Sequence, residues 1–256
     1  MSRFGKLEFD APAKGAAVIS SVRGAEHWLA EAYSAFARGE FEPALRLFAR
    51  VLEFDVHCLG AWTGQVRALI ELEQFREARQ WADKALEQFP EAPEALAAKS
   101  VVLARLGEHD DAMALSDASL AGSGELPYVW LARGDVLSAR REPRAESCFE
   151  RARSLAPGDW LIPWLIARIR QHYRQFAAAL KSLQQAIVLA PAEAVLWVAT
   201  GQCQLALGLE EPARLAFTQA LQLSPHCQPA QAGLNTLNGQ GFTARLAGRL
   251  KALFRP

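Results

Sequence analysis

The chain has 256 residues, 51% of them hydrophobic, which is enough for a sizeable core in one or two domains and argues against a disordered chain. Lys plus Arg and Asp plus Glu both total 28, so the formal net charge is zero and we do not expect nucleic acid as a partner. The four cysteines are far apart in the sequence and form no C-x-x-C pair, which is typical of free thiols in a reducing, cytoplasmic compartment.

Residues 1–24 are predicted to form a flexible N-terminal arm. Glycine and proline interrupt any helical pattern there at Gly5, Pro12, Gly15 and Gly24. The arm lacks the apolar run of a signal peptide, and no stretch of the chain reaches the ~18 to 20 apolar residues that span a bilayer. Its apolar residues Phe4, Leu7 and Phe9 are predicted to dock either onto a partner or into a groove of the same chain.

Residues 25–227 repeat with a period of about 34, which predicts six copies of one structural unit. Alanines mark the period at Ala44, Ala78, Ala112, Ala145, Ala179 and Ala213, with gaps of 34, 34, 33, 34 and 34. Mostly apolar or compact residues follow each alanine at offsets of four and seven, which lie on one face of a helix. Twelve residues after the alanine stands a residue that mostly cannot continue a helix, at Val56, Pro90, Gly124, Pro157, Pro191 and Pro225.

The first half of each unit is predicted to be another helix. A bulky residue stands near its start, at Trp28, Trp62, Leu96, Trp130, Pro163 and Trp197, and a small or compact residue follows four positions later. Because four of the seven tryptophans share this position, core packing explains them better than a ligand cage. The turn between the helices contains Gly39, Gly107 or Gly208 in three units, which suits a helix end with positive φ.

Three units depart from the pattern. The third has Ser116 and Ser119 at its diagnostic positions, the fourth is one residue short near Arg141, and the fifth has Pro163 where a bulky aromatic residue belongs. The register of the first helix is therefore least well defined in the fifth unit.

The combined pattern resembles the tetratricopeptide repeat (TPR) family, whose signature has a large aromatic residue, a small residue, alanine, an aromatic residue, a small residue and proline in this order. The resemblance covers residues 25–227, roughly four fifths of the chain. It implies an all-α fold, a right-handed superhelical solenoid of antiparallel helix pairs. Since such units are stable only when stacked, residues 228–240 are predicted to form a capping helix and a hinge.

In the TPR family, the first helices of successive repeats line a concave groove that receives a partner peptide or helix. The resemblance therefore implies a partner-binding groove formed by Leu29, Tyr33, Phe36, Arg67, Ile70, Val101, Arg105, Tyr128, Asp135, Trp164, Arg168, Gln171 and Gln202. A mixture of aromatic residues and arginine suits hot-spot contacts with a protein. The alternative is that these side chains are solvated or pack against one another. The asparagines of the family's carboxylate-clamp subgroup are lacking, which disfavours a chaperone cofactor.

Residues 241–256 are predicted to form a basic amphipathic helix. An apolar arc contains Phe242, Leu246, Leu250, Leu253 and Phe254, and the basic residues are Arg245, Arg249, Lys251 and Arg255. Such a helix binds an anionic membrane surface or a partner protein. Alternatively, the apolar arc folds back on the last repeat.

No motif for a nucleophile, a catalytic zinc or a phosphate-binding loop occurs, so we predict no enzyme activity, no cofactor and no metal site. The leading hypothesis is a non-catalytic adaptor or scaffold that binds a partner protein or peptide in the groove. The alternative is a peripheral tether that links a membrane surface or a cytoskeletal filament to a large complex through the C-terminal helix. Self-association stays open. Abundant Ala, Leu and Arg with scarce Lys and Asn indicate a bacterial genome.

Overall fold

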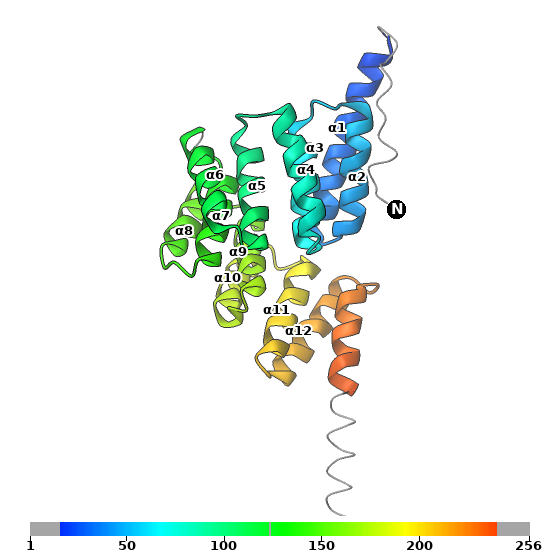
Figure 1. Ribbon diagram of the computed structural model, residues 1–256. Helices are drawn as coiled ribbons and strands as arrows, with labels where there is room; N and C mark the ends of the chain where they lie inside the picture. Colours follow the sequence, from blue (N-terminus) through cyan, green and yellow to red (C-terminus); the bar gives the residue numbers. More distant parts are fainter. Residues whose placement is uncertain (1–15, 123, 240–256) are drawn as a thin grey trace, which may run out of the picture. The chain divides into compact units, whose positions relative to one another are not determined.

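A computed structural model describes residues 16–122 and 124–239, and their side chains from Gly24 onwards. All regular elements in these two ranges are helices (Figure 1). They are α1 (Ala16–Ala37), α2 (Phe41–Phe54), α3 (Leu59–Glu71), α4 (Phe75–Gln88), α5 (Pro93–Leu106), α6 (His109–Gly122), α7 (Pro127–Ala139), α8 (Ala145–Leu155), α9 (Leu161–His172), α10 (Phe176–Leu189), α11 (Ala194–Ala206) and α12 (Glu210–Leu223), followed by a helical segment over residues 228–239. The predicted all-α helical repeat fold is thereby confirmed.

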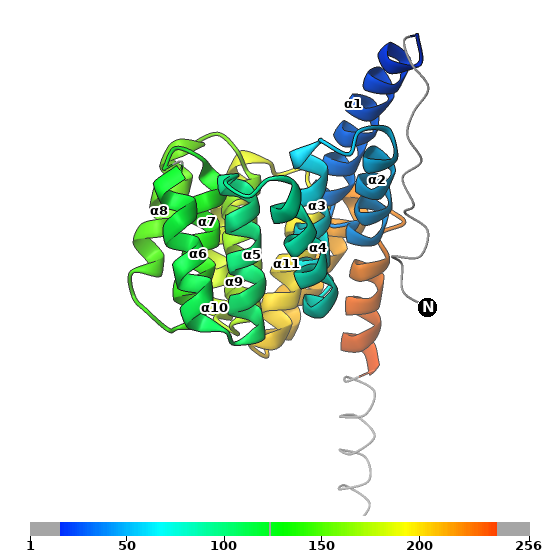
Figure 2. The same ribbon diagram turned by 45° about the horizontal axis from the view of Figure 1, so that its top comes forward.

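The chain divides into two compact units, Met1–Leu155 with α1 to α8 and Ala156–Pro256 with α9 to α12. In unit 1, each helix packs against the next one along the chain (Figures 1 and 2). The first helices of neighbouring repeats also contact each other, α1 with α3, α3 with α5, and α5 with α7. They therefore form one continuous face of unit 1. In unit 2, α9 packs on α10, α10 on α11, and α11 on α12.

The alanines that mark the period lie in the second helix of each pair. Five of them are fully buried, and Ala145 is 8% exposed. The residues four and seven positions further on are also all buried, including the departures Ser116 and Ser119 of the third unit. The Ser119 hydroxyl donates a hydrogen bond of 2.8 Å to the Pro93 carbonyl, which meets the polar group's need for a partner inside the core.

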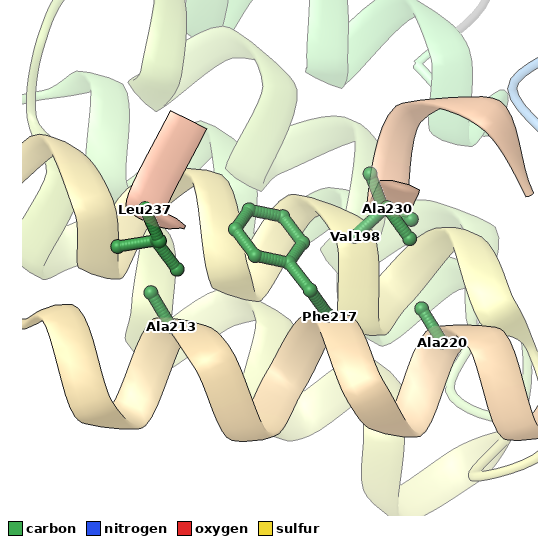
Figure 3. Close-up of a cluster of buried hydrophobic side chains, with 6 residues drawn as sticks. All are labelled: Val198, Ala213, Phe217, Ala220, Ala230 and Leu237. Atoms are coloured by element: carbon green, nitrogen blue, oxygen red, sulfur yellow. The ribbon is translucent and has the colours of Figure 1, made fainter. Parts of the chain in front are cut away.

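Phe217 of α12 shows how the pairs stack. Its ring is 1% exposed and lies in a cluster with Val198, Ala213, Ala220, Ala230 and Leu237 (Figure 3). It packs on two glycines: a Cβ at Gly201 would lie 2.6 Å from the ring, and a Cβ at Gly233 would lie 2.5 Å from it. Gly201 belongs to the same repeat and Gly233 to the segment 228–239. Only residues without a side chain permit this close approach from both sides.

Tryptophans at the start of first helices bind the preceding loop. The indole Nε1–H of each donates to the carbonyl of the residue that was predicted to end the previous helix. These bonds join Trp62 to Val56 at 2.7 Å, Trp130 to Gly124 at 2.8 Å and Trp197 to Pro191 at 2.9 Å. The tryptophans thus fix the connection between repeats.

The turn between the two helices of each pair contains a residue with positive φ. The six residues are Gly39, Glu73, Gly107, Arg141, Arg174 and Gly208, with φ of 75°, 58°, 87°, 58°, 59° and 75°. The expectation for the three glycines is confirmed, and the other three repeats place a non-glycine residue in the same conformation. The fourth repeat lacks one residue between Arg141 and Ala145, so α8 begins at Ala145 and has 11 residues, whereas α10 has 14.

Two details differ from the sequence-based expectation. Helix α1 begins at Ala16, so residues 16–24, which were assigned to the flexible arm, belong to this helix. A glycine inside a helix costs only about 1 kcal/mol relative to alanine, and the packing of α1 on α2 offsets it. Pro163 is the third residue of α9, where its missing N–H would have no partner within the helix in any case. The rest of the arm, residues 1–15, and the predicted helix 241–256 lie outside the described residues.

Candidate functional site

The contiguous first helices of unit 1 carry most of the predicted groove residues. We call the surface formed by Leu29, Tyr33, Phe36, Arg67, Ile70, Val101, Arg105, Tyr128 and Asp135 the first-helix face. These residues come from α1, α3, α5 and α7. The structure therefore brings together residues that are up to three repeats apart in the sequence.

Arg67 of α3 is at the centre of an aromatic cluster on this face. Its guanidinium carbon lies 5.1 Å from the ring centre of Phe36 in α1 and 4.4 Å from that of Tyr128 in α7. Such cation–π contacts contribute about 0.5 to 2 kcal/mol each and fix the guanidinium plane. Among the described residues, no carboxylate lies within ion-pair distance of Arg67 and no acceptor is bonded to it.

Tyr33 is the most exposed aromatic residue of the face, with 39% of its surface accessible. Its hydroxyl donates a hydrogen bond of 3.1 Å to the Gly60 carbonyl, and its ring packs edge-on against Phe48 at 5.2 Å between centres. Burial raises the pKa of Tyr33, and it raises the pKa of Tyr128 to about 12 although the positive charge of Arg67 opposes the shift. Both phenols are therefore neutral near pH 7.

Other predicted groove residues support the face from within. Phe36, Ile70 and Val101 are 5%, 7% and 5% exposed. Arg105 and Asp135 form an ion pair with two hydrogen bonds, Nε to Oδ1 at 3.0 Å and Nη2 to Oδ2 at 2.6 Å. With side chains 5% and 3% exposed, this pair connects α5 to α7 inside unit 1.

The remaining predicted residues belong to unit 2. Trp164 is 1% exposed and packs near Trp160, with 6.0 Å between ring centres. Gln171 donates its amide N–H groups to the Ala199 carbonyl at 3.2 Å and to the Cys203 sulfur at 3.0 Å, and so connects α9 to α11. Arg168 is half-buried and Gln202 is exposed. Trp164 and Gln171 therefore stabilise unit 2.

The sequence reasoning missed an open hollow of about 380 Å³ on α11 and α12. The lining residues carry no charge: Trp197, Thr200, Gln204, Pro212, Leu215, Ala216, Thr218, Gln219 and Gln222. Leu215 is 72% exposed. The sequence signal that could have revealed this hollow is an apolar residue at a position that the repeat does not bury. In residues 16–122 and 124–239, no group of three or more His, Cys, Asp or Glu side chains lies close enough together to hold a metal ion.

The same two ranges contain no helix with the length and apolar character needed to cross a bilayer. Localisation in the cytoplasm, either free or peripheral to a membrane, stays a prediction.

Comparisons with known proteins agree with this architecture. A family model described as tetratricopeptide repeat matches residues 63–127 and 165–226. The bovine (Bos taurus) BBSome complex member BBS4 is 23% identical over 193 residues, which are 75% of this chain and 37% of that protein. This chain therefore spans well under half the length of that relative.

Two solved structures are similar to this chain, and the first of them shares its fold. A tetratricopeptide repeat protein from Parabacteroides merdae aligns with a TM-score of 0.52 and 19% identity over 83% of this chain and 84% of its own. A chain of the APC/C hetero-tetramer Cut9–Hcn1 aligns with a TM-score of 0.49 and 18% identity over 83% of this chain and 42% of its own. With six helix pairs of the expected period and matches in both units, the chain belongs to the tetratricopeptide repeat family.

Proposed function

We propose that the chain is a non-catalytic adaptor or scaffold that binds a segment of a partner protein on the first-helix face. The observation that carries this proposal is Arg67, which is held by two aromatic rings and lies on the same face as the exposed Tyr33. No residue in the ranges 16–122 and 124–239 accepts a hydrogen bond from its guanidinium. Tyrosine and arginine are enriched among residues that dominate protein interfaces. Because packed helices hold these side chains in place, binding loses little side-chain entropy.

The remaining residues of the face have a supporting role in this proposal. The Arg105–Asp135 pair and the buried Phe36 set the spacing of α1, α5 and α7, and a partner contacts Tyr33, Arg67 and the exposed part of Tyr128. The bovine relative is named as a member of a multiprotein complex, which is in keeping with a role in protein assembly.

Selection from a random peptide library on the immobilised full chain tests the proposal. We expect the selected peptides to bind the Tyr33→Ala/Arg67→Ala double variant at least about tenfold more weakly than the original chain. The control is Arg151→Ala/Leu215→Ala, which removes an exposed arginine and an exposed apolar residue that do not belong to the face and should not change the affinity. Equal affinity for the Tyr33/Arg67 variant would place the partner elsewhere.

The alternative function, a peripheral tether to a membrane or a filament, depends on residues 241–256 and stays a prediction. Co-sedimentation with vesicles that contain anionic lipid tests it. The full chain should sediment with the vesicles, and Arg245→Gln/Arg249→Gln/Lys251→Gln/Arg255→Gln should not, since the attraction depends on the basic residues. Equal sedimentation of both chains would contradict a charge-dependent tether.

A further inference from the structure

The hollow on α11 and α12 is a place that the second unit fills with its own side chain. The position three residues after the repeat alanine holds Trp81 there, and its ring centre lies 5.5 Å from that of Trp62 in the first helix of the same pair. In the sixth unit the equivalent residues are Ala216 and Trp197, and both line the hollow. The bulk that the second unit supplies from within is therefore missing from the sixth.

The fifth unit fills the equivalent place in another way. Nη1 of Arg170 in α9 donates hydrogen bonds to the Ser182 hydroxyl at 2.6 Å and to the Ala178 carbonyl at 3.0 Å, both in α10. The three equivalent residues of the sixth unit line the hollow instead: Gln204, Ala216 and Pro212. The sixth unit thus leaves open a place that the second and fifth units fill, and a side chain from outside can enter it.

Leu215 lines the hollow and is largely exposed. The same position of the other five units holds a polar or small residue that is also exposed, at Arg46, Gln80, Ala114, Ser147 and Lys181. The packing of the repeat therefore does not require a leucine at this position. An exposed apolar side chain beside a hollow is typical of a surface that binds another protein.

The segment that forms the hollow is poor in charge. Residues 194–239 contain three charged residues, Glu210, Glu211 and Arg214, in a chain whose charged fraction is 22%, so these 46 residues would contain about ten at the average fraction. Charged residues are depleted in the same way at the core of protein interfaces. A charged ligand would find no counter-charge among the residues that line the hollow, so the fitting occupant is uncharged and apolar.

A second copy of the same surface meets these requirements. Leu215 and the hollow lie together, so two copies related by a two-fold axis offer each other both an apolar side chain and a place for it. Neither lining brings a charge that has to be removed from water. The formal net charge of the chain is zero, so long-range repulsion between two copies is weak.

We propose that the chain forms a symmetric dimer through the hollow on α11 and α12, with Leu215 of each copy in the hollow of the other. The hollow shares no residue with the first-helix face, so this inference goes beyond the proposed function and does not depend on it. The dimer carries two first-helix faces. We expect the affinity of one face for one peptide to be the same in the monomer and in the dimer.

Sedimentation equilibrium of the full chain at roughly 1 to 100 μM tests the proposal. We expect the mean mass to rise from the 28.1 kDa of one chain and to level off at twice that value. Leu215→Glu should raise the dissociation constant at least about tenfold, because it places an unpaired carboxylate in an apolar site. The matched control Gln80→Glu adds the same charge at the equivalent exposed position of the second unit and should dimerise as the original chain does.

A second variant fills the hollow from within. Ala216→Trp gives the sixth unit the side chain that Trp81 supplies in the second, and it should also weaken the dimer at least about tenfold, since Leu215 of the other copy no longer finds room. Circular dichroism and the melting temperature establish that the variant is folded. Gln219→Glu, on the same lining, provides the comparison if the tryptophan variant does not fold.

Cross-linking locates the contact. A photoreactive benzoylphenylalanine at position 215, in a chain mixed with an isotope-labelled copy, should form cross-links to labelled peptides of α11 or α12. Cross-links to other parts of the labelled copy alone would overturn the inference.

The sedimentation results can overturn it as well. A mass of one chain over the whole concentration range would do so, and so would equal dissociation constants for the original chain and Leu215→Glu. A full chain that dimerises only after removal of residues 241–256 would show that this segment occupies the hollow instead. If library peptides bind a monomeric chain through Tyr33 and Arg67, the proposed function stands and the dimer falls.

Discussion

Arg105 of α5 and Asp135 of α7 form a buried ion pair with two hydrogen bonds between repeats that are neighbours in the chain. The residues are 30 positions apart, close to one repeat length. Removing two charges from water is costly, and here the geometry of a fork against a carboxylate compensates for that cost. The pair therefore determines how α5 and α7 lie against each other.

We expect Asp135→Ala to lower the free energy of unfolding by about 3 to 5 kcal/mol, because it leaves the Arg105 guanidinium buried without its counter-charge. Replacement of both residues, Arg105→Met/Asp135→Leu, should cost much less than Asp135→Ala, since no buried charge remains. Urea denaturation of the chain, Arg105→Met, Asp135→Leu and Arg105→Met/Asp135→Leu gives the coupling energy. Additive effects of the two single changes would contradict a direct pair.

Substitution by glycine is predicted to stabilise the turns between paired helices but to destabilise a helix. Glu73 and Arg174 have φ of 58° and 59° and exposed side chains, so Glu73→Gly and Arg174→Gly should raise stability by roughly 0.5 to 1 kcal/mol. Glu77→Gly, in the first turn of α4, should lower it by about 1 kcal/mol because the helical conformation needs no glycine. Thermal unfolding compares the three. A similar loss for Glu73→Gly and Glu77→Gly would show that the left-handed conformation is not under strain.

Gly201 provides a test of the packing around Phe217. A Cβ there would lie 2.6 Å from the ring, which is held from the other side by Gly233, so Gly201→Ala should destabilise the chain by about 1 to 3 kcal/mol. At Gly158 a Cβ would meet nothing within 4 Å, and Gly158→Ala should change stability by less than about 0.5 kcal/mol. Denaturant midpoints distinguish these results. Equal midpoints for the two variants would mean that the ring can move aside.

The raised pKa of Tyr128 predicts that the chain loses stability at alkaline pH. Its pKa is raised from 10.0 to about 12 in the folded chain, chiefly by burial. The stabilisation is thus fully present below pH 10 and disappears as the pH rises through about 12, a loss of roughly 1 to 3 kcal/mol. Tyr128→Phe, which has no ionisable group, should lose less stability between pH 10 and 12. Urea unfolding of both chains across this range measures the difference, and parallel curves would contradict a raised pKa.

The sequence predicted the helix pairs well because the repeat requires small side chains at fixed positions. Ala44 and Ala78 are buried at the same point of their pairs, and any larger residue would separate the helices. The turn glycines followed from the same period. The start of α1 did not follow from the period, because its first residues precede the first repeat. These residues also include Gly24, and the packing that offsets the cost of a glycine in a helix is not visible in the sequence.

The sequence pattern also indicated which residues belong to the predicted groove but not how deeply they lie. Phe36 and Trp164 were predicted as partner contacts, yet they are 5% and 1% exposed, because burial depends on the size of side chains in neighbouring repeats. The sequence did contain one signal of contacts between neighbouring repeats. Opposite charges about one repeat apart are paired in Arg105–Asp135, Arg79–Glu108 and Arg140–Asp110, at separations of 30, 29 and 30.

Gly233 packs on Phe217 as Gly64 packs on Phe48, so the last helix pair meets the segment 228–239 through the kind of joint used inside the array. Within the described residues, the joint after α12 thus uses the same glycine-on-phenylalanine packing as the joint between α2 and α3. A further copy of the 34-residue module, spliced in between Cys227 and Gln228, would meet matching surfaces on both sides. Duplication or deletion of whole modules can thus change the number of first helices without a new core. Gene rearrangement alone can therefore lengthen or shorten the repeat array.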